Sequence, residues 1–446
     1  MNRTTLAITS IAALLVGLDA TVVATALTAV RADLGGGAEG LEWTVNAYTL
    51  TFAVFMLSAA ALGDRFGRRR VFAAGLTVFA LASAACGLAP GLPALIAARA
   101  VQGVGAAAVM PLALALLGAS VAPERRARAL GAFTAVVGVS VPVGPLLGGL
   151  FVDTVSWRLV FLINVPVIAV LVPLLLRRVP ETRGAAARLD VPGLLLAGAA
   201  AFGLVFGLTY ANWPALIAGG LLVVAFVAIE RRASVPMLPM RLFASRAFTA
   251  GNAAILLLWA SAFGAVYYMA QFLQVGLGSR PLVAGLQLVP WGAMTVVVPR
   301  IVGALIPRVG ERWFVAGGMA LHGAAILWIA AIASPGLPYW QLVAPLVLSG
   351  TGVAAAIPAT QSAVLGAVAM PDMGKASGVY STLRQLGGAV GVAAMVAVFG
   401  IAGALDGPGV FTDGFTVAMA VSGALAGVGA VVGMGLRRRT RVPLLA

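Results

Sequence analysis

Leu62-Gly-Asp-Arg-Phe-Gly-Arg-Arg-Arg70 is the stretch of sequence that decides the fold. It lies between two long apolar runs, Trp43–Ala61 and Val71–Ala89, and it carries five charges, four of which are arginines. A short charged segment between two apolar helices must lie in water at one face of a membrane, and its arginines place that face on the cytoplasmic side. A plain positive-inside loop would explain the charge bias alone. The position of Asp64 inside the arginine cluster favours a more specific role.

The composition excludes an ordinary globular protein. Hydrophobic residues make up 61% of the 446 residues, charged residues only 10%, and the mean hydropathy is +1.04. Soluble domains carry about 25% charged residues. The apolar runs are continuous and ~20 residues or longer, which indicates helices rather than the short alternating strands of a membrane β-barrel. We therefore predict an all-α polytopic protein in a lipid bilayer.

The net charge of +15 does not indicate a nucleic-acid partner. The basic residues cluster in short loops, where membrane topology explains them, and no basic face interleaved with aromatic residues occurs. Cys86 is the only cysteine and is expected to be a small core residue. His322 is also single, and metal sites need several ligands, so we expect no metal and no cofactor.

Apolar runs of helical length predict fourteen spans. They cover residues 5–30, 43–62, 71–89, 92–118, 128–152, 158–178, 190–210, 213–230, 248–275, 282–304, 313–333, 338–368, 376–404 and 414–436. The first run continues past Asp19 to about Val30, which favours a retained span over a cleaved signal peptide.

Alternate loops differ in charge, and this difference predicts the orientation. One set holds most of the basic residues, namely Arg65–Arg70, Arg125–Arg128, Arg177–Arg188, Arg231–Arg246, Arg308–Arg312, Lys375 and Arg437–Arg441. The other set has only Arg31, Arg158 and Arg280. The positive-inside rule then predicts a multi-pass protein of the inner (plasma) membrane with both termini cytoplasmic, and the even number of spans agrees.

The chain contains an internal repeat. Gly103-Val-Gly-Ala-Ala-Ala-Val-Met-Pro111 resembles Gly350-Thr-Gly-Val-Ala-Ala-Ala-Ile-Pro358, and Arg128–Gly131 resembles Lys375–Gly378 at the same distance along the chain. Spans 1–6 therefore match spans 9–14 in the same orientation. Two parallel repeats are a known transporter plan, with the substrate site between the halves near the midplane.

The repeat predicts three parts of the chain. We expect an N-terminal six-helix bundle over residues 1–180, a linker with two extra transmembrane helices over residues 181–246, and a C-terminal six-helix bundle over residues 247–446.

Asp19 is the only acidic residue predicted to lie well inside a span. A charge at that depth costs about 2.5–3.5 kcal/mol on insertion scales, so it is a functional candidate by default. Arg99 is an isolated charge in the fourth span, and helical rise places the two residues at depths of roughly 16 and 10 Å from the same edge, within reach of each other. We predict that Asp19 carries a coupling proton and that Arg99 stabilises its ionised form; the alternative is a purely structural ion pair.

Several motifs resemble those of one transporter family. Leu62–Arg70 resembles the loop signature of the major facilitator superfamily between its second and third helices. Gly144-Pro-Leu-Leu-Gly-Gly149 resembles the fifth-helix motif of its fourteen-span drug/proton antiporters. Further segments resemble that subfamily, namely Leu18–Leu27, Ala98–Gly105, Trp157–Pro166 and Phe272–Gly285, with departures at Ala24, Thr28, Ala60 and Ser140.

The resemblance implies the major facilitator fold, with two six-helix bundles plus two inserted helices, and it implies roles for two motifs. The loop would be a cytoplasmic gate that clamps helix ends in the outward-facing state, with gate residues Gly63, Asp64, Arg65, Gly67, Arg68 and Arg69. Gly144, Pro145, Gly148 and Gly149 would keep the central cavity proton-tight and bias the protein toward export. Ordinary close packing of helices is the alternative for these small residues.

Candidate substrate contacts are aromatic and amide side chains in the spans. They are Gln102, Trp259, Tyr267, Tyr268, Gln271, Gln274, Trp291 and Gln361. Membrane aromatics are also common as lipid-facing or interfacial anchors. For Arg384, in the thirteenth span, snorkelling to the interface competes with a position in the cavity.

These observations predict a monomeric, proton-coupled exporter of small amphipathic compounds such as drugs or antibiotics, and not an enzyme. An exporter or uptake carrier dedicated to one native metabolite is the alternative within transport, although the Gly144–Gly149 motif argues against uptake. A membrane enzyme or receptor is disfavoured, because the sequence has no nucleotide-binding loop, metal cluster or Ser/His/Asp set.

Overall fold

The computed structural model describes residues 3–184, 190–233, 236 and 238–436. Within these residues the chain is helical, and fourteen helices are long and apolar enough to cross a membrane, so the predicted number of spans is confirmed. The helices are α1 (Arg3–Leu34), α2 (Ala38–Phe66), α3 (Arg68–Gly87), α4 (Leu92–Ala119), α5 (Pro123–Gly138), α6 (Ser140–Thr154), α7 (Leu159–Leu162), α8 (Asn164–Arg178), α9 (Val191–Thr209), α10 (Trp213–Arg232), η1 (Met240–Ala244), α11 (Arg246–Val275), α12 (Pro281–Gln287), α13 (Val289–Val309), α14 (Glu311–Ile332), α15 (Trp340–Leu365), η2 (Met370–Asp372), α16 (Met373–Ala402) and α17 (Pro408–Met434).

Three predicted spans are interrupted, each just before a proline. The fifth span divides into α5 and α6 at Val139, the sixth into α7 and α8 at Ile163, and the tenth into α12 and α13 at Leu288. Pro142, Pro166 and Pro290 follow the three breaks. Proline has no N–H for the carbonyl four residues earlier, and its ring crowds that carbonyl, so the helix bends or breaks there.

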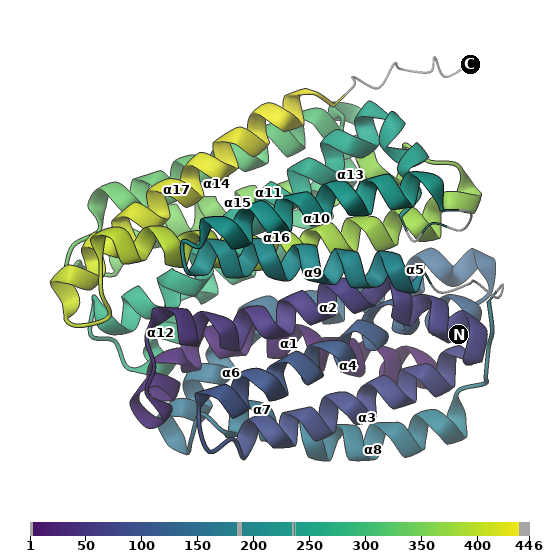
Figure 1. The fold of residues 1–446 in the computed structure, drawn as a ribbon, viewed down its shortest axis with the longest axis horizontal. Helices are drawn as coiled ribbons and strands as arrows, with labels where there is room; N and C mark the ends of the chain where they lie inside the picture. The colour runs from purple at the N-terminus through teal and green to yellow at the C-terminus, as the bar shows by residue number, and fades with distance from the viewer. Residues whose placement is uncertain (1–2, 185–189, 234–235, 237, 437–446) are drawn as a thin grey trace.

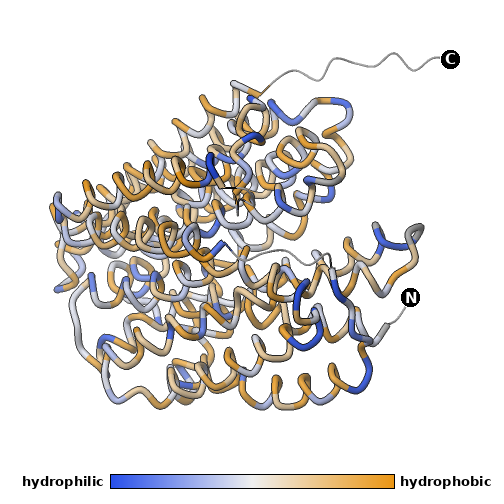
Figure 2. The backbone as a smooth tube through the Cα atoms, turned by 45° about the vertical axis from the view of Figure 1, so that its right-hand side comes forward, coloured by the Kyte–Doolittle hydropathy of each residue, from blue (hydrophilic) through white to orange (hydrophobic). Residues whose placement is uncertain are grey.

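The helices form two bundles that pack against each other (Figure 1). Helices α1–α8, the N-terminal bundle, pack mainly on one another, and so do helices α11–α17, the C-terminal bundle. The inserted helix α9 packs on α2 of one bundle and α16 of the other, and α10 packs on the outside of α9. Apolar residues dominate the helices, and hydrophilic stretches concentrate toward their ends (Figure 2).

In each bundle, a glycine at the same position of the repeat brings two helices of that bundle into direct contact. A Cβ atom on Gly103 would lie 2.3 Å from the Tyr48 carbonyl oxygen, and one on Gly350 would lie 2.3 Å from the Trp291 carbonyl oxygen. In both bundles the glycine of the repeated motif is therefore where the fourth helix touches the second. This packing supports the internal repeat inferred from the sequence.

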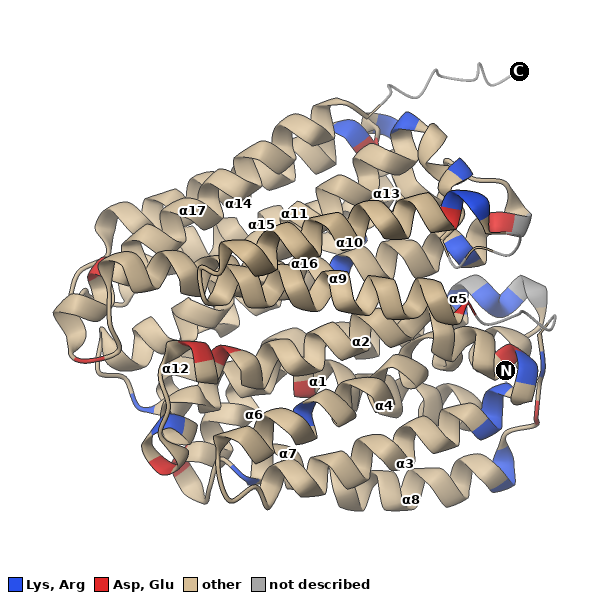
Figure 3. Ribbon diagram, viewed as in Figure 1, with Lys and Arg blue, Asp and Glu red and all other residues tan. Residues whose placement is uncertain are grey.

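The ends of the molecule differ in charge. Lys and Arg gather at one end of both bundles, the end where α1 begins (Figure 3). We call it the basic end and the other the opposite end. Arg188 and the run Arg437–Arg441, which were predicted to belong to this basic set, lie outside the described residues.

The two bundles are joined at the opposite end. A Cβ atom on Gly149 of α6 would lie 2.2 Å from the Pro281 carbonyl oxygen of α12, and one on Gly285 would lie 2.5 Å from the Pro145 carbonyl oxygen. Two ion pairs and a hydrogen bond cross the same seam, namely Arg31–Asp406, Arg280–Asp153 and Thr28–Gln274. The described state is therefore closed at the opposite end.

Replacement of Gly149 by Ala is expected to disfavour this closed seam. The added methyl group has no space beside Pro281, and overpacking of this kind costs about 1–3 kcal/mol. Thermal unfolding of purified protein should show a lower midpoint for Gly149→Ala. Gly220→Ala in α10 is the matched control, because nothing lies within 4 Å of its Cβ position. Equal midpoints for the two variants would contradict the packing described.

Candidate functional site

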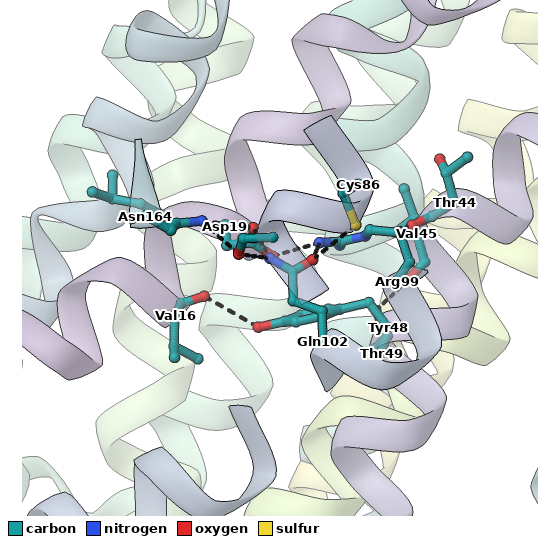
Figure 4. A network of polar contacts seen from close by, with 12 residues as sticks. Val16, Asp19, Thr44, Val45, Tyr48, Thr49, Cys86, Arg99, Gln102 and Asn164 are labelled. Atoms are coloured by element: carbon teal, nitrogen blue, oxygen red, sulfur yellow. Dashed lines mark hydrogen bonds and ion pairs between the residues drawn. The ribbon is translucent and has the colours of Figure 1, made fainter. Parts of the chain in front are cut away.

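Asp19 is buried inside the N-terminal bundle and is held by three side chains. Arg99 donates a hydrogen bond to Asp19 Oδ2 at 2.5 Å, and Gln102 Nε2 donates to Asp19 Oδ1 at 2.8 Å. Asn164 Nδ2 lies 3.4 Å from the same Oδ1 atom. Figure 4 shows Asp19 between Asn164 on one side and Arg99 with Gln102 on the other. The predicted proximity of Asp19 and Arg99 is confirmed, and both side chains are at most 1% exposed.

Arg99 has partners besides Asp19. Its Nε atom donates to the Thr44 carbonyl oxygen at 2.8 Å, and its Nη1 atom donates to Gln102 Oε1 at 2.6 Å. Its guanidinium carbon lies 4.2 Å from the centroid of the Tyr48 ring, which adds a cation–π contact. The arginine therefore keeps much of its coordination when the charge on Asp19 is removed.

Helix packing explains why these residues meet. Arg99 and Gln102 are three residues apart, so they lie on one face of α4. Gly103 lets α4 approach the backbone of α2, and this approach brings Arg99 Nε within hydrogen-bonding distance of Thr44. Ser83 of α3 completes the network by accepting a hydrogen bond from Gln102 Nε2 at 2.8 Å. Ser83 and Asn164 were not predicted as members of this network, because each is an isolated polar residue in an apolar run.

A cavity of about 530 Å³ lies between the two bundles, near their middle and toward the basic end. It is lined by residues of α1, α2, α4, α5 and α6 on one side and of α11, α13, α15 and α16 on the other. Gly17, Ala20 and Thr21 line it from α1, so the helix that carries Asp19 also forms a wall of the cavity.

Half of the predicted substrate contacts lie on this cavity. Trp259, Tyr267, Trp291 and Gln361 line it. The other four, Gln102, Tyr268, Gln271 and Gln274, do not line it, and each has another environment.

Those four residues are held within helix contacts. Gln102 is fully buried in the Asp19 network, and the Tyr268 ring stacks on Phe399 at 4.6 Å between centroids. Gln271 Nε2 donates to the Tyr267 carbonyl oxygen at 3.2 Å, and Gln274 accepts the hydrogen bond from Thr28 at the closed seam. The type of a residue alone does not predict whether it lines the cavity or is buried between helices.

The segment Leu62–Arg70, predicted as a loop, is almost entirely helical, because α2 ends at Phe66 and α3 begins at Arg68. Its partners lie within the segment itself and at Glu181, which follows α8. Asp64 forms an ion pair with Arg68, with 2.7 Å between Asp64 Oδ1 and Arg68 Nη2. The Glu181 carboxylate accepts from the backbone N–H groups of Arg69 at 2.8 Å and Arg70 at 3.2 Å, in the first turn of α3. Unpaired N–H groups and the helix dipole make this helix start a favourable site for a carboxylate.

The two glycines of the loop have distinct structural reasons. Gly67 has φ +110°, which side-chain-bearing residues rarely adopt, and a Cβ there would lie 2.8 Å from the Glu181 carboxylate. Gly63 packs against Leu112 of α4, whose Cδ2 would lie 2.3 Å from an added Cβ. Among the described residues, the ion pairs of this segment join it to itself and to Glu181, which follows α8, and none reaches the C-terminal bundle.

The Gly144–Gly149 segment lies between α1 and α12. Added Cβ atoms on Gly144 and Gly148 would lie 1.9 Å from Thr21 Oγ1 and 2.3 Å from Thr25 Oγ1. The hydroxyl of Thr25 donates to the Pro145 carbonyl oxygen at 3.3 Å. The segment thus packs α6 tightly on the Asp19-bearing helix and, through Gly149, on the other bundle.

Glu42 is a buried acid inside a span, whereas the predicted bounds placed it just outside. Helix α2 begins at Ala38 rather than near Trp43, so Glu42 lies one turn inside it and is fully buried. Asn46 Nδ2 and the Thr209 hydroxyl donate to its Oε1 atom at 2.5 and 2.8 Å, while its Oε2 atom has no hydrogen-bond partner. The three glycines at 35–37, which end the preceding loop, were the signal for the earlier helix start.

Comparison with known proteins decides the family. The model of the Major Facilitator Superfamily matches residues 9–392. The chain belongs to the major facilitator superfamily. It is 36% identical over 417 residues to the multidrug resistance protein Stp of Mycobacterium tuberculosis (strain CDC 1551 / Oshkosh), covering 89% of this chain and 76% of that protein. It is 40% identical over 414 residues to the cephamycin export protein CmcT of Amycolatopsis lactamdurans, covering 89% of this chain and 85% of that protein.

Solved structures share the superfamily fold at low sequence identity. A POT family transporter in complex with 5-aminolevulinic acid superposes with a TM-score of 0.72 at 13% identity, covering 96% of this chain and 94% of that chain. The human organic anion transporter MFSD10 (TETRAN) gives a TM-score of 0.67 at 17% identity, covering 97% and 99%. At these identities the likeness establishes the arrangement of helices and not the substrate.

The Asp19–Arg99 pair gives a prediction for the stability of this superfamily member. Arg99→Gln leaves a buried carboxylate without its cation, a change that costs about 3–5 kcal/mol. The double variant Asp19→Asn/Arg99→Gln removes both charges and should recover much of the lost stability. Thermal unfolding of the purified variants measures both effects. A double variant no more stable than Arg99→Gln would contradict a direct charge pairing.

Proposed function

We propose that this transporter exports small amphipathic compounds, antibiotics or other drugs among them, in exchange for protons by alternating access. The observation that carries the proposal is a central cavity whose wall, α1, also bears the buried Asp19–Arg99 pair. Relatives at 36% and 40% identity are named as a multidrug resistance protein and a cephamycin export protein, which supports export of drug-like compounds. No chemical conversion of the cargo is part of this function.

Asp19 is the proposed proton carrier. In its ionised form it is stabilised by Arg99 and Gln102. A proton removes the charge and weakens the attraction that ties α1 to α4, whereas Arg99 stays bound to Thr44 and Tyr48. Because Gly17, Ala20 and Thr21 are close to Asp19 on the same helix, a shift of α1 changes the cavity directly. This coupling makes proton binding and substrate binding mutually dependent.

Alternating access requires the seam at the opposite end to separate. The two bundles, residues 1–180 and 247–446, would rock as units, with residues 181–246 as the linker between them. The seam contains small residues and a few polar contacts, including Arg31–Asp406 and Arg280–Asp153, which an opening motion can break. The tight contacts of Gly144, Pro145, Gly148 and Gly149 would keep protons from leaking while the seam is closed.

The basic end is proposed to face the cytoplasm of a monomeric protein in the plasma membrane, with both termini on that side. Its arginines satisfy the positive-inside rule. In the described state the gate residue Asp64 pairs with Arg68 beside it. When the cavity closes at this end, Asp64 and Arg65 would instead clamp the ends of helices, which is the proposed role of Gly63, Asp64, Arg65, Gly67, Arg68 and Arg69 together.

Substitution of Asp19 by Asn tests the proposal. An efflux-deficient host expressing the wild type should tolerate higher concentrations of at least one compound in a panel that includes puromycin and a cephamycin. Everted vesicles should accumulate that compound, and a protonophore should collapse the accumulation. Asp19→Asn should reduce proton-driven accumulation by at least about tenfold, because a lost coupling charge removes the driving force.

Asp413→Asn is the matched control, because Asp413 is exposed near the start of α17. It should transport like the wild type. Full gradient-driven export by Asp19→Asn would contradict the assignment of the proton to Asp19. Accumulation inside right-side-out vesicles, driven by an inward proton gradient, would contradict export and indicate an uptake carrier.

A further inference from the structure

The central cavity carries positive charge that no carboxylate among its described lining residues balances. Among the described residues that line it, the charged side chains are Arg300 of α13 and Arg384 of α16, and no Asp or Glu is among them. Arg384 lies eleven residues after the start of α16 at Met373, which is roughly 16 Å into the membrane at helical rise. Of the two alternatives for Arg384, the structure supports a position in the cavity rather than snorkelling to the membrane interface.

No carboxylate of the described residues pairs with Arg384. None of the ion pairs in the described part of the chain includes it, and its buried Nε atom has no hydrogen-bond partner. Buried donors are nearly always satisfied in native proteins, and an unpaired charge at membrane depth is costly. An unpaired arginine here indicates that a bound ligand supplies the hydrogen-bond acceptor.

A second unsatisfied donor lies beside the first. The guanidinium carbon of Arg384 lies 5.1 Å from the centroid of the Trp259 ring, and the indole Nε1 atom of Trp259 is also buried without a hydrogen-bond partner. Both residues line the cavity. Two neighbouring donors, one of them charged, fit an oxyanion such as a carboxylate or sulfonate, which accepts several hydrogen bonds at once.

Aromatic surface surrounds these donors. Trp259 packs on Phe263 with 4.8 Å between ring centroids, and Phe263 and Trp291 both line the cavity. The remaining wall is largely apolar. The site therefore offers a charged hydrogen-bond donor next to a flat apolar surface, which is the complement of a molecule with an aromatic body and an anionic group.

We infer that the central cavity selects amphipathic organic anions, with Arg384 and the Trp259 indole N–H binding the anionic group and the neighbouring aromatic residues binding the apolar body. Arg300, an exposed residue that also lines the cavity, adds a second positive charge that attracts the same class. This inference rests on the proposed function, since it names the substrate class of the proposed transport site. It also implies that cations are poor cargo, because they would meet two unbalanced arginines.

Binding of three matched probes tests the inference without a gradient. The probes are 1-pyrenebutyrate, the uncharged 1-pyrenebutanamide and the cationic 1-pyrenebutylamine, measured by fluorescence with wild-type protein in nanodiscs of neutral lipid and corrected with empty nanodiscs. A hydrogen-bonded charge should make the anion bind about tenfold tighter than the amide. The amine should bind most weakly. Equal affinities of anion and amide, or a preference for the amine, would overturn the inference.

Two variants locate the preference. Arg384→Gln should bring the anion and the amide to similar affinities, while its amide affinity stays near the wild-type value and shows that the variant is folded. Arg384→Lys should keep part of the preference, because it keeps the charge. Arg231→Gln, at the exposed end of α10, is the control and should behave like the wild type. An unchanged anion preference in Arg384→Gln would overturn the assignment.

The outcomes separate this inference from the proposed function. Proton-driven export of uncharged drugs by a protein with no anion preference would overturn the inference and leave the proposed function standing. A clear Arg384-dependent anion preference in a protein without Asp19-dependent export would support the inference and contradict the proposed coupling.

Discussion

The ion pair between Asp19 and Arg99 is the interaction on which the rest of the site depends. Both charges are buried at membrane depth, where neither is stable alone, and hydrogen bonds from Gln102 and to Thr44 satisfy their remaining donors and acceptors. The pair ties α1 to α4 inside one bundle, and α1 in turn packs on α6, which seals the opposite end. A change in the charge of Asp19 can therefore alter the packing of α1, which affects both the cavity wall and the seam between the bundles.

The two halves of the molecule repeat a packing plan but not its chemistry. Gly103 and Gly350 make equivalent helix contacts, yet the polar core of the C-terminal bundle is uncharged, with His322 hydrogen-bonded to the hydroxyls of Ser261 and Ser349. The described residues of that bundle bring their buried charge to the cavity instead, at Arg384. One bundle thus carries the candidate proton site and the other carries the candidate anion site.

Much of the fold was predictable because it follows from local physical rules. The length of the apolar runs predicted the number of spans, and the arginines in alternate loops predicted which end of the molecule is basic. The repeated glycine motifs predicted which helices of the two bundles correspond. The contact between Asp19 and Arg99 was predictable because an isolated charge inside an apolar span is stable only beside an opposite charge. Helix starts and side-chain directions were less predictable. Glu42 was placed outside its span, and the predicted substrate contacts Gln102 and Tyr268 are buried between helices and do not line the cavity of the described state. The unpaired state of Arg384 depends on residues far away in the sequence, so no local pattern predicts it.

Infrared difference spectroscopy tests the central claim, that Asp19 is the group that takes up the proton. Acidification of purified wild-type protein in lipid should produce the carbonyl band of a newly protonated carboxylic acid. That band should be absent from Asp19→Asn and retained in Glu42→Gln, which removes another buried acid inside a span of the described chain. A band that persists in Asp19→Asn, or one that disappears only in Glu42→Gln, would contradict the account.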